Sequence, residues 1–220
     1  MARTIVYVDG FNLYHRQLEK RPALRWLNVK ALAERLLGPQ NQISEVKYYT
    51  AHASGAINPE TPKRQQIYLD ALKTIPEISV FFGHFLRKPK WAGLFHPPEF
   101  RPLTQLDQPW PNVVKVWKTE EKGSDVNLAS HLIRDAFVGA FDVTAVISND
   151  SDLVEPIKIV AAEVSRPVGL ITTVPRPNPE LVQAATFIRR IRNSDLKACQ
   201  FPDPVPRNPD PPLAKPATWV

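Results

Sequence analysis

Short apolar segments alternate with helical stretches along most of this chain, and this alternation limits the possible folds more than any other feature. The predicted strands cover residues 3–8, 46–53, 78–86, 113–119, 143–148 and 168–172. The predicted helices cover residues 11–19, 29–37, 61–72, 126–137, 153–163 and 181–191. Apolar strands separated by helices are typical of a parallel sheet that helices cover on both faces. We therefore predict a single doubly wound α/β domain.

Proline is the unusual residue of the composition, and its distribution marks two irregular regions. Of the 23 prolines, six lie within residues 89–111 and seven within residues 202–216. Proline fixes φ and lacks the N–H group, so neither region is expected to form a helix or a central strand. We predict one domain over residues 1–200 with an irregular insertion near 87–112, followed by a Pro-rich tail at 201–220. The tail is expected to be extended and poorly ordered, and binding of a protein partner is the alternative.

The composition excludes several classes of protein. A single cysteine excludes a disulfide framework and a Cys-rich metal site, and it fits the reducing cytoplasm, where we expect the protein. No apolar run reaches the roughly 18 residues that cross a bilayer. The first apolar run ends at Asp9, too early for a signal peptide. The net charge of +6 weakly favours polyanionic partners.

Acidic side chains follow three of the predicted strands. Asp9 follows the first strand, Asp125 follows the strand at 113–119, and the segment VTAVIS is followed by Asp150 and Asp152. In doubly wound sheets, ligands bind beyond the carboxyl ends of the strands, where the strand order reverses. We therefore expect the four carboxylates to meet at one edge of the sheet.

Each of these carboxylates also has a purely structural interpretation. Asp125 fits a helix N-cap, Asp152 with Glu155 resembles a capping box, and Asp9 with the following glycine fits a turn. Four carboxylates together are harder to explain in this way, because like charges a few ångströms apart repel one another. A divalent cation removes the repulsion, and carboxylate oxygens suit Mg²⁺ or Mn²⁺. We therefore predict a metal site.

The residues of this site favour metal-dependent hydrolysis of a phosphodiester. A cation held by carboxylates can activate a water molecule as the nucleophile and neutralise the phosphodiester in the transition state. The sequence has no G-x-S-x-G elbow, Walker A loop, G-x-G-x-x-G fingerprint or H-E-x-x-H motif, and no histidine neighbours Cys199. These absences leave no competing nucleophile or cofactor motif.

Basic and aromatic residues are interleaved in residues 84–118. Six basic residues outnumber two acidic ones there, an excess of four within the chain's net +6: Arg87, Lys88, Lys90, Arg101, Lys115 and Lys118. The aromatic residues that accompany them are Trp91, Phe95, Phe100, Trp110 and Trp117. Phosphate pairing and base stacking by such residues suit single-stranded nucleic acid. In the alternative, the rings pack on the domain and the lysines are only solvated.

Three blocks of the sequence together resemble the NYN domain, and within it the LabA-like proteins, a branch of the PIN-like (FLAP-nuclease-like) superfamily. The blocks are VDGFNLYH, EEKGSDVNLASHL and SNDSDLVEP, in the order of the family, and the resemblance covers residues 3–200. It implies a Rossmann-like three-layer α/β/α sandwich with a mostly parallel sheet, and a ribonuclease site that uses Mg²⁺ or Mn²⁺. The family's acidic positions, which would be metal ligands and catalytic residues, fall on Asp9, Asp125, Asp150 and Asp152.

The resemblance also assigns supporting residues. Asn12 and Ser148 match polar positions of the family and are expected to orient a carboxylate, a water or a phosphate oxygen. Lys122 belongs to the second block, and it either contacts phosphate or pairs with a carboxylate of the site. The chain departs from the family pattern at three positions. His131 and Thr186 stand where the family usually has aspartate, and Asn149 stands where it usually has glycine. We expect His131 to lie outside the direct metal ligands.

Two other functions compete with this interpretation. The D-x-D spacing of Asp150 and Asp152 also occurs in haloacid-dehalogenase-type phosphatases, but there it follows the first strand. The other competitor is a non-catalytic adaptor that keeps the fold and binds nucleic acid or protein. The function we predict is a metal-dependent ribonuclease, specifically an endoribonuclease, with single-stranded RNA as its partner. A homo-oligomer is compatible with the sequence.

Overall fold

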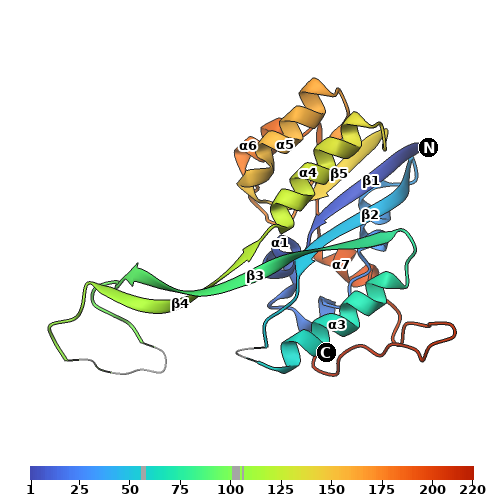
Figure 1. Cartoon of the computed structure of the whole chain (residues 1–220). Helices are drawn as coiled ribbons and strands as arrows, with labels where there is room; N and C mark the ends of the chain where they lie inside the picture. The colour runs from blue at the N-terminus through green and yellow to red at the C-terminus, as the bar shows by residue number, and fades with distance from the viewer. Residues whose placement is uncertain (56–57, 101–104, 106) are drawn as a thin grey trace.

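The chain forms a sheet flanked by helices, with a long two-stranded arm (Figure 1). The computed structural model describes residues 1–55, 58–100, 105 and 107–220. The strands are β1 (Ala2–Asp9), β2 (Asn41–Ala51), β3 (Ile78–Gly93), β4 (Val113–Lys122), β5 (Val143–Ile147), β6 (Val168–Thr172) and β7 (Phe187–Arg190). The α-helices are α1 (Gly10–Leu13), α2 (Val29–Leu37), α3 (Glu60–Lys73), α4 (Ser124–Phe137), α5 (Val154–Lys158), α6 (Pro179–Ala184) and α7 (Asn193–Ala198). Shorter helical turns are η1 (Tyr14–Leu18), η2 (Pro22–Leu24), η3 (Ser151–Leu153) and η4 (Ile159–Glu163).

The seven strands form one sheet in the order β4-β3-β2-β1-β5-β6-β7. Every neighbouring pair is parallel except β3 with β4, which is antiparallel. Since β1 lies between β2 and β5, the strand order reverses beside β1, at the place where such sheets bind ligands. The predicted mostly parallel, doubly wound sheet is confirmed.

Two hydrophobic clusters cover the two faces of the sheet. In β1, Val6 and Val8 belong to the cluster that includes residues of α2, α3 and α7, while Ile5 and Tyr7 belong to the cluster that includes residues of α4 to α6. Successive side chains of a strand point to opposite faces, so this central strand is buried on both. The helices accordingly lie on two sides of the sheet (Figure 1), which gives the predicted three layers. No helix within the described residues is long and apolar enough to span a bilayer.

The prediction of one helix over residues 181–191 is wrong. Helix α6 ends at Ala184, and residues 187–190 form strand β7, which pairs in parallel with β6. The ring of Phe187 lies so close to Gly169 that a Cβ at this glycine would lie 2.4 Å from it. Pairing and packing against β6 therefore override the helical spacing of the apolar residues in this segment.

The region near 87–112 is more regular than its prolines suggest. Strand β3 continues through Arg87 and Trp91 to Gly93, and it pairs with β4 along its whole outer half. Pairing with β2 ends at Gly83, so beyond this point β3 and β4 form a two-stranded arm without further strands beside it. Proline is tolerated in such a ribbon because no third strand needs its missing N–H group. Arg101 lies outside the described residues.

The Pro-rich tail packs against the domain, unlike the poorly ordered segment that its composition predicts. Phe201, Val205 and Trp219 are buried and join the hydrophobic cluster of α2 and α3. The Trp219 ring contacts Trp26 and Tyr68, with ring centres 6.2 Å from each. Aromatic burial therefore fixes a segment that has neither helix nor strand.

A buried ion pair connects the sheet to α4. The Asp135 carboxylate, 3% exposed, accepts hydrogen bonds from Tyr7 Oη at 2.6 Å and from the ammonium group of the buried Lys47. Burial opposes ionisation of Asp135, but the hydrogen bonds from Lys47, Tyr7 and Arg134 outweigh it and lower the pKa of the carboxyl. Asp135 therefore stays ionised and balances the charge of Lys47.

Asp135→Ala is expected to lower the free energy of unfolding by about 3 kcal/mol, because it removes the nearer carboxylate of the buried Lys47 ammonium and leaves, among the described residues, only Glu45 at 3.5 Å. Urea denaturation at pH 7 measures the change. The control is Asp70→Ala, which removes a carboxylate that pairs with Lys73 at the surface of α3 and should cost less than about 1 kcal/mol. Equal losses in the two variants would contradict this role of Asp135.

Candidate metal centre

Three carboxylates from distant parts of the chain meet at the edge of the sheet. Asp9 is the last residue of β1, Asp125 lies in the first turn of α4, and Asp150 follows β5. One carboxylate oxygen from each lies within 4.8 Å of the others. The strands β1 and β5 are adjacent at the reversal of the strand order, so the sheet itself brings two of the three together.

Asp9 is held in place by its own hydrogen bonds. Its carboxylate accepts from the Asn12 backbone N–H at 2.9 Å and from the Ser148 hydroxyl at 2.8 Å. It therefore caps α1, a structural role, and also contributes an oxygen to the acidic group. Gly10 permits this tight connection, because a Cβ there would lie 2.6 Å from the Tyr49 carbonyl oxygen.

A sharp turn positions Asp125 at the start of α4. Gly123 has a φ of 98°, in the left-handed region that favours glycine. The carboxylate of Glu121 accepts from both the backbone N–H and the hydroxyl of Ser124, at 3.1 and 2.7 Å. Glu121 thus provides the hydrogen-bond acceptor at the N-terminus of α4. Asp125 lies inside the helix and is not its N-cap, so the purely structural interpretation of Asp125 does not apply. The Asp125 side chain is free to join the acidic group.

A hydrogen-bonded network supports the loop after β5. The Ser148 hydroxyl, which donates to Asp9, accepts from the Asp150 backbone N–H at 3.0 Å. The side-chain oxygen of Asn12 accepts from the Asn149 backbone N–H and from the Thr173 hydroxyl, at 3.2 and 2.6 Å. Asn12 and Ser148 therefore orient the loops that carry the carboxylates. Thr173 was missed by sequence reasoning, because no motif marks it.

The three carboxylates lack a neutralising partner. Burial raises the pKa of Asp9, with hydrogen bonds to Asn12 and Ser148 acting against this. Burial and the charges of Asp9 and Asp150 raise the pKa of Asp125 to about 6. Among the described residues, no lysine or arginine lies within 4 Å of any of the three carboxylates. Oxygen ligands in an uncompensated negative cluster fit a divalent cation, so the group could hold a divalent metal ion.

Asp125→Asn is expected to stabilise the metal-free protein at pH 8 by about 1–2 kcal/mol, after allowance for solvent screening at this partly exposed side chain. The raised pKa means that ionisation of Asp125 destabilises the folded state, and this loss begins near the ordinary pKa of 3.8 and is complete once the pH exceeds about 6. Thermal melts in a chelator at pH 3.5, 5 and 8 measure the difference, which should be close to zero at pH 3.5, about half of its full size at pH 5 and complete at pH 8. Added Mn²⁺ should raise the melting temperature of the unmodified protein only.

The other predicted residues near the site lie outside this group. Asp152 is exposed and is not one of the three, although its charge contributes to raising the pKa of Asp125. It does not cap α5, so the predicted capping box is absent. Lys122 pairs with Glu120 at 3.2 Å. As expected, His131 is apart from the acidic group: its ring nitrogen lies 2.9 Å from the Tyr49 hydroxyl.

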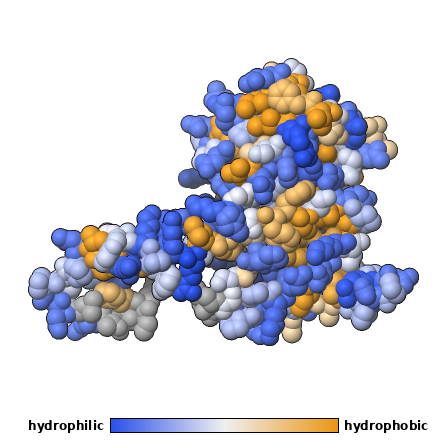
Figure 2. Space-filling view, viewed as in Figure 1, coloured by the Kyte–Doolittle hydropathy of each residue, from blue (hydrophilic) through white to orange (hydrophobic). Residues whose placement is uncertain are grey.

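The basic and aromatic residues of the arm stand on a regular ribbon. Trp91 lies opposite Lys115, and Arg87 stacks on the ring of Trp117 at 4.8 Å. Trp91 and Trp117 are 65% and 64% exposed, so the rings do not pack on the domain as in the alternative interpretation. Lys88 and Lys90 are exposed, and Lys118 forms an ion pair with Glu120. Figure 2 shows the arm as a largely hydrophilic projection from the body of the molecule.

The α/β sandwich with acidic residues at the reversal of its strand order is compatible with a nuclease-type fold, and the family match assigns it to that class. The model of the NYN domain family matches residues 3–191, and the chain belongs to this family. NYN domains typically act on nucleic acids as nucleases, and the LabA-like branch is consistent with the match.

Two known proteins are similar to the chain. A relative from Pseudomonas putida, named 6-hydroxy-3-succinoylpyridine 3-monooxygenase HspA, is 26% identical over 243 residues, which cover 99% of this chain and 75% of the relative. A crystal structure of a protein of unknown function from Vibrio parahaemolyticus RIMD 2210633 covers 87% of this chain and 94% of its own, with a TM-score of 0.52 and 17% identity. The second likeness concerns the fold alone.

Proposed function

We propose that the protein is a metal-dependent endoribonuclease that hydrolyses phosphodiester bonds of single-stranded RNA. The observation that carries the proposal is the meeting of Asp9, Asp125 and Asp150, with no lysine or arginine of the described residues within 4 Å of their carboxylates. Mg²⁺ or Mn²⁺ bound there would activate water and neutralise charge on the phosphodiester. Membership of the NYN family supports the same chemistry.

We assign a different role in the proposed reaction to each group of site residues. Asp9, Asp125 and Asp150 are the proposed ligands and catalytic residues, and Asn12 and Ser148 hold the first and third of them in place. Asp152 is a more distant contributor: because it is exposed and outside the group, we assign it the positioning of a water molecule. Lys122, beside the start of α4, would attract phosphate once the RNA competes with Glu120 for its ammonium group.

The arm is the proposed contact for RNA. Its cations attract the phosphates without regard to sequence, and its exposed tryptophans offer ring faces to bases. The residues assigned to RNA binding are Arg87, Lys88, Lys90, Trp91, Lys115, Lys118 and Lys122. The acidic group and the basic arm are separate regions of the molecule. This separation supports a model in which the arm holds the RNA at some distance from the bond that is cleaved.

Cleavage of an RNA labelled at its 5′ end tests the proposal. Internal fragments should appear with Mn²⁺ and disappear with an excess of chelator. A circular RNA should also be opened, since an endonuclease needs no free end. Release of inorganic phosphate from small esters without internal cleavage would instead support a phosphatase, and absence of both activities would support the adaptor.

A second candidate function comes from the Pseudomonas relative. Its printed name describes oxygenation of a substituted pyridine, and the match extends over 99% of the chain, beyond the residues matched by the NYN model. In this candidate, the edge of the sheet would serve chemistry on a small aromatic compound. Incubation with 6-hydroxy-3-succinoylpyridine, dioxygen and a two-electron reductant, which together balance the insertion of one oxygen atom and the release of the other as water, followed by product analysis, separates this candidate from RNA hydrolysis.

A further inference from the structure

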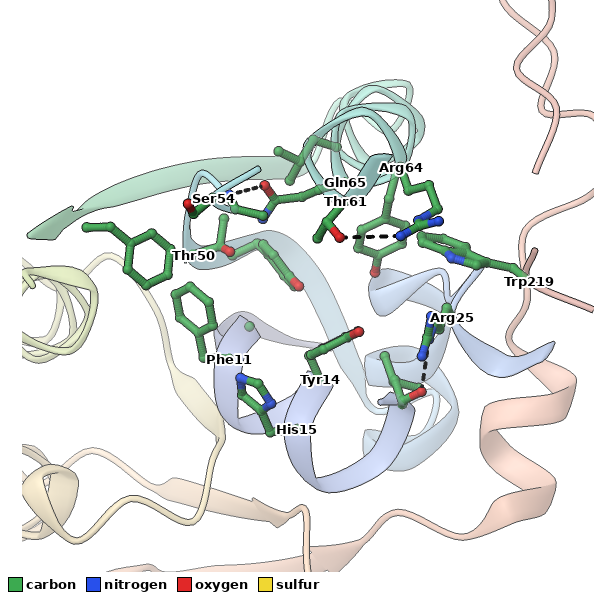
Figure 3. Close-up of a pocket in the computed structure, with 17 residues that line it drawn as sticks. Phe11, Tyr14, His15, Arg25, Thr50, Ser54, Thr61, Arg64, Gln65 and Trp219 are labelled. Atoms are coloured by element: carbon green, nitrogen blue, oxygen red, sulfur yellow. Dashed lines mark hydrogen bonds between the residues drawn. The ribbon is translucent and has the colours of Figure 1, made fainter. Parts of the chain in front are cut away.

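A cavity of about 320 Å³ lies next to the metal centre, on the face of the sheet that α1 and α3 cover. Gly10, the residue after Asp9, lines this cavity. Tyr48 lines the cavity as well. Burial, and to a smaller extent the nearby charge of Asp9, raises the pKa of the Tyr48 hydroxyl. The cavity thus extends from the end of β1 to the end of the chain, where Trp219 closes it (Figure 3). Its volume is that of a site for a small molecule or a single nucleotide.

Aromatic side chains form much of the wall of the cavity. Phe11 and Tyr14 lie opposite Thr61 and Gln65 of α3 in Figure 3. The six aromatic residues of phenylalanine, tyrosine and tryptophan type each come from a different element or segment: Phe11, Tyr14, Tyr48, Tyr68, Phe85 and Trp219. Flat rings around a cavity favour a flat ring as the occupant, through stacked and edge-to-face contacts.

The charged groups of the cavity are all basic. Arg25 and Arg64 line it, and no aspartate or glutamate does. Within the described part of the chain, neither guanidinium lies within 4 Å of a carboxylate. Arg25 donates to the backbone carbonyls of Leu18 and Glu19, whereas the hydrogen bond that Arg64 makes within the described residues is a long one, to the Thr61 hydroxyl at 3.3 Å. Arg64 in particular is available for an anionic group.

Trp219 forms a fixed aromatic part of the same wall. The residue is 6% exposed, and the contacts of its ring with Trp26 and Tyr68 hold it in this position. Its indole nitrogen is enclosed by the protein, so a molecule in the cavity meets carbon atoms of the ring and not the N–H group. Trp219 therefore offers the cavity an apolar, aromatic surface.

We propose that the cavity binds a small aromatic ring that carries an anionic group. The ring lies among the aromatic side chains, and the anion pairs with Arg64 and Arg25. This chemistry has two sources, a nucleotide of an RNA strand or a free aromatic acid. Binding requires no metal ion, so the proposal goes beyond the proposed hydrolysis and is tested separately from it.

Calorimetric titration of the full chain in a chelator tests the cavity with two kinds of probe. The nucleotide probes are adenosine and uridine 5′-monophosphates, and the acid probe is 3-phenylpropionate. Each is paired with its neutral counterpart: adenosine, uridine and 3-phenylpropanamide. At least one anionic probe should bind, and its neutral counterpart should bind at least about tenfold more weakly. Binding of the monophosphates identifies the nucleotide source, and binding of the acid alone identifies the free acid.

Three variants locate the binding. Arg64→Gln should weaken binding by about tenfold or more, and Trp219→Leu, which removes an aromatic ring from the wall, by about threefold or more. Lys63→Gln is the matched control, since Lys63 is an exposed cation on the same helix that does not line the cavity, and it should leave affinity unchanged. The proposal is overturned if no anionic probe binds the folded protein at millimolar concentration, or if Arg64→Gln, verified as folded, binds as tightly as the unmodified chain. Probe binding without RNA cleavage would reject only the proposed hydrolysis.

Discussion

Replacing Asp9 with asparagine is expected to lower the rate of Mn²⁺-dependent RNA cleavage by about a thousandfold. Asparagine keeps the size of the side chain and an oxygen that can still accept from the Asn12 backbone N–H. What it removes is a negative charge from a group of three oxygens that lie within 4.8 Å of one another. Single-turnover cleavage of labelled single-stranded RNA with saturating Mn²⁺ measures the loss.

A graded series distinguishes this site from a contaminating nuclease. Asp150→Asn should match Asp9→Asn, whereas Asp152→Asn should lose only about tenfold, because its exposed carboxylate lies outside the group. Glu155→Gln, an exposed carboxylate on α5, should cleave at the unmodified rate. Equal residual activity in all four variants would indicate a contaminant and favour the adaptor.

Removing three charges from the arm is expected to weaken RNA binding by about 10- to 100-fold at low salt, while the metal centre stays intact. The combined variant changes Lys88, Lys90 and Lys115 to glutamine. These lysines are chosen because none of them lies within 4 Å of a carboxylate in the described structure, unlike Lys118. The slope of log affinity against log salt should fall by about 2, which is the share of three phosphate contacts on a single strand.

Binding is measured in an Asp9→Asn background so that RNA is not consumed during the titration. The matched control changes Lys20, Lys158 and Lys197, exposed lysines outside the arm, and it removes the same net charge. The control should lose less than about threefold, since these lysines act only through the overall charge. If both triple variants lose affinity and salt dependence equally, the arm has no specific role.

The proximity of Asp9 and Asp150 could be predicted from the sequence because it follows from the topology of the sheet and not from local packing. Once the strands are parallel, the carboxyl ends of β1 and β5 must share an edge, whatever the details of packing. Asp125 is nearby because the turn at Gly123 starts α4 at the same edge. Asp152 shows the limit of this reasoning. The end of a strand predicts at which edge of the sheet a residue lies, but the direction of its side chain depends on the local turns.

The parts that could not be predicted depend on competing contacts. The apolar spacing of residues 181–191 fits a helix, but Gly169 leaves room for the Phe187 ring and favours a strand. In the arm, Pro89 lies within β3 and is tolerated there because no third strand pairs with this part of the ribbon. Residues 94–100 and 107–112, between the two strands, form neither helix nor strand, as their prolines predict. The cavity was also missed, because Arg64 and Trp219 are far apart in sequence and share no motif.

The central claim is that the carboxylates of Asp9, Asp125 and Asp150 together bind divalent metal, and diffraction from Mn²⁺-soaked crystals tests it most directly. Data collected at the manganese absorption edge reveal the ion by its anomalous scattering. We predict one or two strong anomalous peaks within coordination distance of the three carboxylates, and none there in crystals of Asp9→Asn. A well-occupied manganese elsewhere on the chain, with no peak between these carboxylates, would contradict the account.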